Sequence, residues 1–93
     1  MRTIERATKF RRDYKREAKG PHRQTLDEDL GIVIQLLLTD QPLPTKFKDH
    51  PLSGTWKNFR DCHVRPDLVL MYRKLGTDKL QLARLGSHSE LGF

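Results

Sequence analysis

The sequence is poor in the residues on which several common kinds of site depend. Its 93 residues include one cysteine, Cys62, which excludes an internal disulfide framework and suits the reducing cytoplasm. There is no cysteine pair for a zinc site and no glycine-rich phosphate loop. No apolar run approaches the roughly 18 residues that span a bilayer, and the N-terminus does not resemble a signal peptide. We therefore expect one cytoplasmic domain, residues 1–93, with no membrane segment, no metal site and no cofactor.

Acidic residues are also scarce. Twelve Asp and Glu residues face 18 Lys and Arg residues, which gives a formal net charge of +6 and a sequence pI near 9.8. Such a balance favours an anionic partner, such as nucleic acid, an acidic protein or an anionic membrane. The hydrophobic fraction is only 35%, but much of it lies in the runs 26–38 and 68–72, which indicates a folded domain with a charged surface.

The N-terminal half predicts two helices. Residues 1–7 are expected to form a short edge strand. From Thr8, a candidate N-cap, apolar residues recur every four positions and give one buried helical stripe that ends before Gly20-Pro21. Residues 25–28 have the pattern of a capping box, and residues 26–38 carry a wide apolar face. The two helices, joined by a short loop, should form an antiparallel hairpin.

The C-terminal half has the pattern of an antiparallel sheet. Strands are expected near residues 57–64, 68–74 and 79–85, with turns at residues 65–67 and 76–78. The middle segment is apolar without alternation, so both of its faces should be covered, one of them by the helices. The sequence therefore predicts an α+β fold, in which an N-terminal helix hairpin packs on a small twisted antiparallel β-sheet.

Titratable side chains gather around these strands. His63 and Asp67 flank the turn at Pro66, His50 lies on a proline-ended loop, and His88 follows the last strand. A twisted small sheet can bring both loops to one surface. The pattern therefore predicts three imidazoles and a carboxylate among Arg and Lys side chains, whereas His22 lies apart, beside the helix turn.

This set of groups suits the cleavage of RNA. A base removes the proton of the ribose 2′-hydroxyl, an acid protonates the departing 5′-oxygen, and cations stabilise the phosphoryl charge. Histidine titrates near neutral pH and can serve as either group, and each well-placed acid or base contributes about 10²- to 10⁴-fold in rate. No metal ion is needed. DNA, which lacks the 2′-hydroxyl, could not be cut in this way.

Each feature also has a structural interpretation. An isolated loop histidine is usually solvated, Asp67 could satisfy the backbone of its own turn, and Cys62 fits a small core position. Trp56 could belong to the core or stack on a base. The first helix carries cations that could form a solvated face or contact phosphates, namely Lys9, Arg12, Lys15 and Arg16.

Several blocks of the C-terminal half resemble the YafQ branch of the RelE/ParE toxin superfamily in order and spacing. These blocks are residues 48–57, 60–68 and 84–91, together with Leu70 and Tyr72. The resemblance implies a bacterial type II toxin, a ribosome-dependent mRNA endoribonuclease that cuts codons in the A site and arrests translation. The implied partners are a cognate antitoxin, the ribosome with its rRNA, and mRNA.

The same resemblance implies roles for individual residues. It makes His88 the general acid, His50 or His63 the base, and Asp67 an orienting or stabilising group. Lys57 and Arg84 are candidates for phosphate contact. The family often has a Phe four residues after the last histidine; here that position is Gly92, and Phe93 comes one residue later.

Two other functions are open at this point. A toxin of the ParE type would act on DNA gyrase without a catalytic histidine set. A non-catalytic basic RNA-binding module would need exposed stacking aromatics and would tolerate the loss of every histidine.

Overall fold

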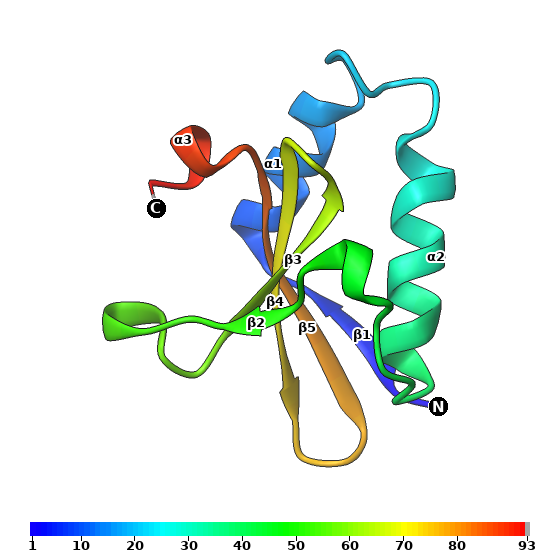
Figure 1. Ribbon diagram of the computed structural model, residues 1–93, viewed down its shortest axis with the longest axis vertical. Helices are drawn as coiled ribbons and strands as arrows, with labels where there is room; N and C mark the ends of the chain where they lie inside the picture. The colour runs from blue at the N-terminus through cyan, green and yellow to red at the C-terminus, as the bar shows by residue number, and fades with distance from the viewer. Residues whose placement is uncertain (93) are drawn as a thin grey trace.

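The protein folds as a pair of helices packed on one twisted sheet (Figure 1). A computed structural model describes residues 1–92. The α-helices and strands are β1 (Thr3–Arg6), α1 (Thr8–Glu17), α2 (Leu26–Leu38), β2 (His50–Pro51), β3 (Arg60–Arg65), β4 (Leu68–Leu75), β5 (Lys79–Gly86) and α3 (His88–Leu91). Two 3-10 helices, η1 (Thr45–Phe47) and η2 (Gly54–Trp56), flank β2. This arrangement confirms the predicted α+β fold.

The strand order across the sheet is β1-β5-β4-β3-β2. β3, β4 and β5 pair antiparallel, as predicted. His50, which was expected on a loop, instead lies on the short strand β2, which is antiparallel to β3, and β1 runs parallel to β5. The expectation of an entirely antiparallel sheet was therefore wrong at this edge. The intervening helices and strands form the long crossover that a parallel pair requires, so β1 need not be joined to its neighbour by a hairpin.

β4 is the central strand, and residues 68–72 are buried without interruption, as the lack of alternation predicted. On the helix side its side chains join a core made by Phe10 of α1, Val33 of α2 and Cys62 of β3, among others. Met71, on the other face, is also fully buried. The sheet is thus covered on both faces along this strand, and the face opposite the helices is shielded from water there.

The helix limits agree closely with the pattern, but the caps do not. Neither Thr8 nor Thr25 caps a helix through its side chain; the Thr25 hydroxyl instead accepts a hydrogen bond from Arg65 at 3.0 Å. α3 was not predicted, although its capping box is complete: Ser87 and Glu90 each accept a hydrogen bond from the other's backbone amide. Among residues 1–92, no helix has the length and apolar content needed to cross a membrane.

α1 lies along the part of β5 that β1 does not reach. β1 pairs with residues 79–82 only. Beyond that point the Asp13 carboxylate accepts a hydrogen bond from the Leu85 amide at 3.0 Å, and Arg16 donates to the Leu85 carbonyl at 2.7 Å. Side chains of α1 thus satisfy the backbone groups that a longer edge strand would have paired.

Candidate active site

Three of the predicted site residues meet on the sheet face opposite the helix pair. Along β3, Cys62 and Val64 belong to the core under the helices, so Asp61 and His63 point to the other face. β2 pairs with β3 so that His50 lies directly across from Asp61. His88 begins α3, just past the end of β5. The structure therefore brings together histidines from three segments far apart in the sequence.

Asp61 lies at the centre of this group, although the sequence did not single it out. Its carboxylate is 3.0 Å from Nε2 of His50 and 3.8 Å from Nε2 of His88. The rings of His63 and His88 meet edge to face with centroids 5.1 Å apart. The available signal was its position on one strand two residues before His63, which puts the two side chains on the same face.

Asp61 is the most buried charged group of the site, with 1% of its surface exposed. Among the described residues neither of its oxygens has a hydrogen-bond partner, although Nε2 of His50 lies only 3.0 Å away. Burial raises the pKa of Asp61, and the nearby charges of His50 and the other two histidines oppose that rise only in part. A buried carboxyl group in this state is typical of a functional site rather than of a stabilising one.

The backbone fixes the ring orientation of two histidines. Nδ1 of His50 is 2.8 Å from the carbonyl oxygen of Lys48, and Nδ1 of His63 is 3.2 Å from that of Pro66. Nε2 of His50 thus faces Asp61 on the neighbouring strand. The side chains of His50 and His88 are about half exposed, at 49% and 47%, so a substrate can reach them while Asp61 stays beneath.

α1 supports the segment that carries His88. Arg16 lies 3.2 Å from Glu90 of α3 and 3.0 Å from Asp13. Asp13 also accepts hydrogen bonds from Arg84 at 2.7 and 3.3 Å. Burial raises the pKa of Asp13, but these hydrogen bonds and the adjacent positive charges outweigh it and hold that pKa below its usual value.

Asp67, by contrast, contacts a different histidine. It lies on the turn between β3 and β4, and its side chain is 71% exposed. Its carboxylate is 2.8 Å from Nε2 of His22, which follows α1. The structure thus pairs Asp67 with the histidine that sequence reasoning had set aside, whereas Asp61 takes the central position expected for a carboxylate.

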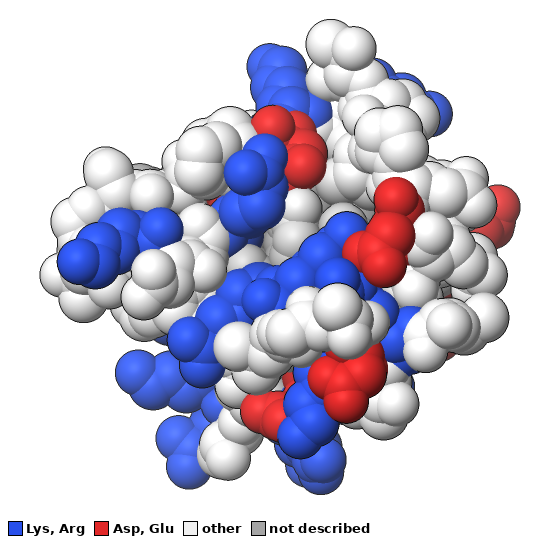
Figure 2. Space-filling view, turned by 90° about the horizontal axis from the view of Figure 1, so that it is seen from below, with Lys and Arg blue, Asp and Glu red and all other residues white. Residues whose placement is uncertain are grey.

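The predicted phosphate-binding cations fall into two groups. Arg84 and Arg16 are held by carboxylates and the backbone, and the Arg84 side chain is only 19% exposed. Four others are exposed and remain candidates for phosphate contact, namely Lys9, Arg12, Lys15 and Lys57. Figure 2 shows Lys and Arg side chains forming a band across one face of the molecule, with only a few carboxylates among them.

Two further cations, which the sequence reading missed, lie beside His63. A groove of about 440 Å³ runs between α2 and the end of β3, and its lining includes Lys46, Lys48, His63 and Arg65. Lys46 and Lys48 are exposed, whereas Arg65 is paired with Asp29 at 2.7 Å. Only the fold brings these lysines into one groove with His63, because they precede His63 by 15 residues or more in the chain.

Of the two aromatic residues predicted to contact RNA, the structure describes Trp56 but not Phe93. Trp56 is half-buried outside the core and packs edge to face on Phe59, with ring centroids 5.5 Å apart. The guanidinium of Arg73 also packs over the Phe59 ring, 4.6 Å from its centre. Base stacking by Trp56 stays a prediction, and Phe93 lies outside the described residues.

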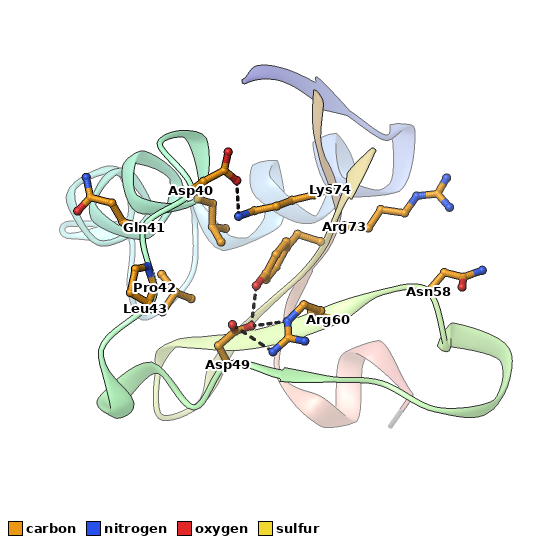
Figure 3. A pocket seen from close by; sticks show the side chains of 11 residues that line it. Asp40, Gln41, Pro42, Leu43, Asp49, Asn58, Arg60, Arg73 and Lys74 are labelled. Carbon is orange, nitrogen blue, oxygen red and sulfur yellow. Dashed lines mark hydrogen bonds and ion pairs between the residues drawn. The ribbon is translucent and has the colours of Figure 1, made fainter. Parts of the chain in front are cut away.

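A second pocket, also of about 440 Å³, lies between the end of α2 and strands β3 and β4 (Figure 3). Asp49 projects into it and accepts hydrogen bonds from Tyr72 at 2.6 Å and from Arg60 at 3.2 and 3.3 Å. On the opposite wall Lys74 pairs with Asp40 at 2.7 Å. These charges satisfy one another, so the cluster anchors the segment that leads into His50 rather than forming a reactive site.

Cys62 is confirmed as a core residue. It is fully buried, and burial raises the pKa of its thiol, which keeps the sulfur protonated and unreactive. Within residues 1–92, no group of three or more His, Cys, Asp or Glu side chains has an arrangement that could hold a metal ion.

The sequence and the fold were compared with known proteins. The sequence model of one protein family, described as the bacterial toxin of type II toxin–antitoxin systems, YafQ, matches residues 2–92. The mRNA interferase toxin YafQ of Escherichia coli K12 is 38% identical over 91 residues, which cover 95% of this chain and 97% of that protein.

Solved structures agree. A metal-bound toxin from Helicobacter pylori is 46% identical, with a TM-score of 0.81 over 98% of this chain and 99% of that one. A chain of the Escherichia coli DinJ–YafQ complex is 36% identical, with a TM-score of 0.77 over 98% of each chain. Sequence and fold thus point to the same group of proteins along nearly the whole length.

Proposed function

The chain belongs to the YafQ family of type II toxin–antitoxin toxins, and on that premise we propose that it is an endoribonuclease that cleaves mRNA codons in the ribosomal A site and so arrests translation. The observation that carries the proposal is the meeting of His50, His63 and His88 around Asp61 on one accessible face. An antitoxin, expected to present acidic groups to this basic chain, would hold it inactive in the cell.

The reaction needs only groups that this face supplies. His50 or His63 takes the proton of the ribose 2′-hydroxyl, and the 2′-oxygen bonds to phosphorus. The bond from phosphorus to the 5′-oxygen then breaks, and His88 gives that oxygen a proton, which leaves a 2′,3′-cyclic phosphate and a 5′-hydroxyl. Lys46 and Lys48, which line one groove with His63, would stabilise the phosphoryl charge.

The exposed cations support binding to the ribosome. Among residues 1–92, Lys9, Arg12 and Lys15 of α1 and Lys57 after η2 take no part in the carboxylate network that holds Arg16 and Arg84. Each phosphate that such a cation neutralises releases counterions, so the affinity for rRNA should fall steeply with salt. Asp67, which pairs with His22, would act by holding the turn next to His63 rather than by touching the substrate.

The test is primer extension on a defined mRNA with purified ribosomes. Wild-type protein should cut only when ribosomes are present, and His88→Ala and His63→Ala should each lose at least about 10²-fold in cleavage rate. Glu28→Gln, an exposed substitution on α2, serves as the control and should cut normally. Full cleavage by both histidine variants would refute the proposal, as would growth arrest with DNA damage and intact mRNA.

We further propose that catalysis needs no metal ion in the toxin. Because ribosomes require Mg²⁺, the chelator must act on the toxin alone. Protein treated with EDTA, desalted and then added to ribosomes should cut as fast as untreated protein, and added copper or zinc should not raise the rate. Activity that disappears after this treatment and returns with one metal would overturn the metal-free mechanism but not the ribonuclease activity.

A further inference from the structure

We propose that Asp61 is a positioning residue that keeps a proton on Nε2 of His50 and thereby leaves His63 to act as the base. The proposal rests on the ribonuclease function proposed above, but it concerns proton positions that can be measured on the free protein. With 1% exposure, Asp61 cannot touch an RNA substrate, so its effect must pass through the imidazole that faces it.

The argument begins with the ring of His50. Its Nδ1 lies 2.8 Å from the carbonyl oxygen of Lys48, and because a carbonyl only accepts, Nδ1 must carry a hydrogen. In a neutral ring Nε2 would then present a lone pair, yet it faces an oxygen of Asp61 at 3.0 Å. Two lone pairs at this distance repel each other. A proton on His50 or on Asp61 removes this repulsion.

The charges around Asp61 determine which residue holds that proton. Three imidazoles face the carboxylate, from β2, β3 and α3, and one further carboxylate, Asp49, acts on it from the segment before β2. Burial disfavours a lone charge at Asp61, so the carboxylate becomes charged only together with an imidazolium. Without a proton on His50 or on itself, Asp61 would be a buried charge with no imidazolium at the 3.0 Å contact.

His63 is set up differently. Its Nδ1 is 3.2 Å from the carbonyl oxygen of Pro66, so that nitrogen also carries the hydrogen in a neutral ring. Its Nε2 then has a lone pair that is available to the ribose 2′-hydroxyl. The ring lies against His88, with centroids 5.1 Å apart, which places an acid beside this base. His50, charged next to Asp61, would stabilise the phosphoryl oxygens instead of taking a proton.

The direct test reads the histidine nitrogens by NMR on ¹⁵N-labelled free protein near neutral pH. In the wild type, Nε2 of His50 should give the signal of a protonated nitrogen, and Nε2 of His63 should not. In the isosteric variant Asp61→Asn, Nε2 of His50 should lose its proton. Asp78→Asn, the same substitution on an exposed turn of the β4–β5 hairpin, should leave every histidine signal unchanged.

Kinetics distinguish positioning from a merely structural role. Asp61→Asn should lower kcat on ribosomes by about 10²-fold with little change in KM. The deficit should shrink as the pH falls from about 8 to about 6, because solvent then supplies the proton that Asp61 no longer holds. A defect of folding would not recover in this direction. Asp78→Asn should match the wild type at every pH.

The outcomes separate the two proposals. If Nε2 of His50 is unprotonated in the wild type, or keeps its proton in Asp61→Asn, the role of Asp61 is wrong even when mRNA is cut. If the NMR result holds but no RNA is cleaved, only the ribonuclease function fails. Should Asp61→Asn not fold, His50→Ala provides the reciprocal test: the ¹³C titration midpoint of the Asp61 carboxyl group should move to higher pH, and no movement would refute the coupling.

Discussion

Two buried aspartates in this protein are held in opposite ways. Asp13 of α1 is 3% exposed and accepts hydrogen bonds from two arginines and from the Leu85 amide. Asp61 of β3 is 1% exposed and has no well-directed hydrogen bond among the described residues. Partners lower the pKa of Asp13 against the effect of burial, whereas burial raises the pKa of Asp61. The first carboxylate joins α1 to the sheet, and the second costs stability at the place where the histidines meet.

The largest change in the free energy of unfolding is expected when the Asp13 carboxylate is removed. Asp13→Asn should lower the free energy of unfolding by about 3 kcal/mol, because breaking a buried ion pair leaves Arg84 without its partner. Urea unfolding at neutral pH measures the change. Asp78→Asn, on an exposed turn, should stay within about 0.5 kcal/mol of the wild type. An equally small effect at Asp13 would show that α1 does not depend on this carboxylate.

Asp61→Asn should act in the opposite direction. At neutral pH it should raise the free energy of unfolding by on the order of 1 kcal/mol, because it removes a charge that is buried without a well-directed hydrogen bond. The same urea measurement applies. A loss of stability comparable to that of Asp13→Asn would mean that the two carboxylates are alike, and the contrast between them would disappear.

The pH dependence of stability should separate the same two groups. Asp13, whose pKa is lowered on folding, contributes stability above the usual Asp pKa, and that contribution is lost as the pH falls through its folded value. Asp61, whose pKa is raised, contributes stability below the usual value and loses it as the pH rises through its folded value.

Unfolding curves between about pH 3 and pH 7 check these signs. The stability gained by Asp61→Asn should grow as the pH rises, whereas the stability lost in Asp13→Asn should shrink as the pH falls. A difference from the wild type that is independent of pH for either variant would contradict the assigned pKa direction of that residue.

The network around Asp13 can also be disturbed through the backbone. A Cβ at Gly86 would lie 2.6 Å from Nη2 of Arg16 and 3.1 Å from Oε1 of Glu90. Gly86→Ala should therefore cost about 1 kcal/mol by displacing Arg16 from the Leu85 carbonyl. Gly31→Ala, where a Cβ has open space within α2, should instead stabilise by up to about 1 kcal/mol. Equal effects in the two variants would show that Gly86 is not crowded.

The smallest effect is expected at the exposed cations of α1. Arg12→Gln should change the free energy of unfolding by less than about 0.5 kcal/mol, since Arg12 is exposed, while Arg16 on the same helix is held by carboxylates. It should lower the slope of log affinity for ribosomal RNA against log salt by about 0.7 to 0.9. An unchanged slope would remove Arg12 from the RNA-binding surface.

Local patterns were enough for most of the fold. The limits of α2 and the position of β4 followed from periodicity and from an uninterrupted apolar run, because both express burial against a large neighbour. The buried stripe expected on α1 at Phe10, Tyr14 and Ala18 was wrong at Ala18, which is exposed. Asp13 and Glu17 are buried on this helix instead. A carboxylate on a helix gives no sign in the sequence that an arginine 71 positions later will pair with it.

For the site, the sequence supplied the chemistry and the fold supplied the arrangement. His50, His63 and His88 could be named from residue type, spacing and family resemblance. Asp61 could not, because an acid on a strand is ordinarily solvated, and only the pairing of β2 with β3 and the position of α3 close it off from water. Asp67 was named for the same face, but its turn brings it to His22.

The sequence by itself determined the order of the two long helices and the main strands, the basic character of the surface and the presence of imidazoles suited to acid–base work, but not α3. These properties depend on composition and on contacts between near neighbours in the chain. The tertiary structure alone decided the parallel placement of β1, the pairing of Asp13 with Arg84 and the position of Asp61 beneath His50. Those features depend on which distant segments become neighbours, and a carboxylate acquires its function from the charges and the solvent exclusion that such neighbours provide.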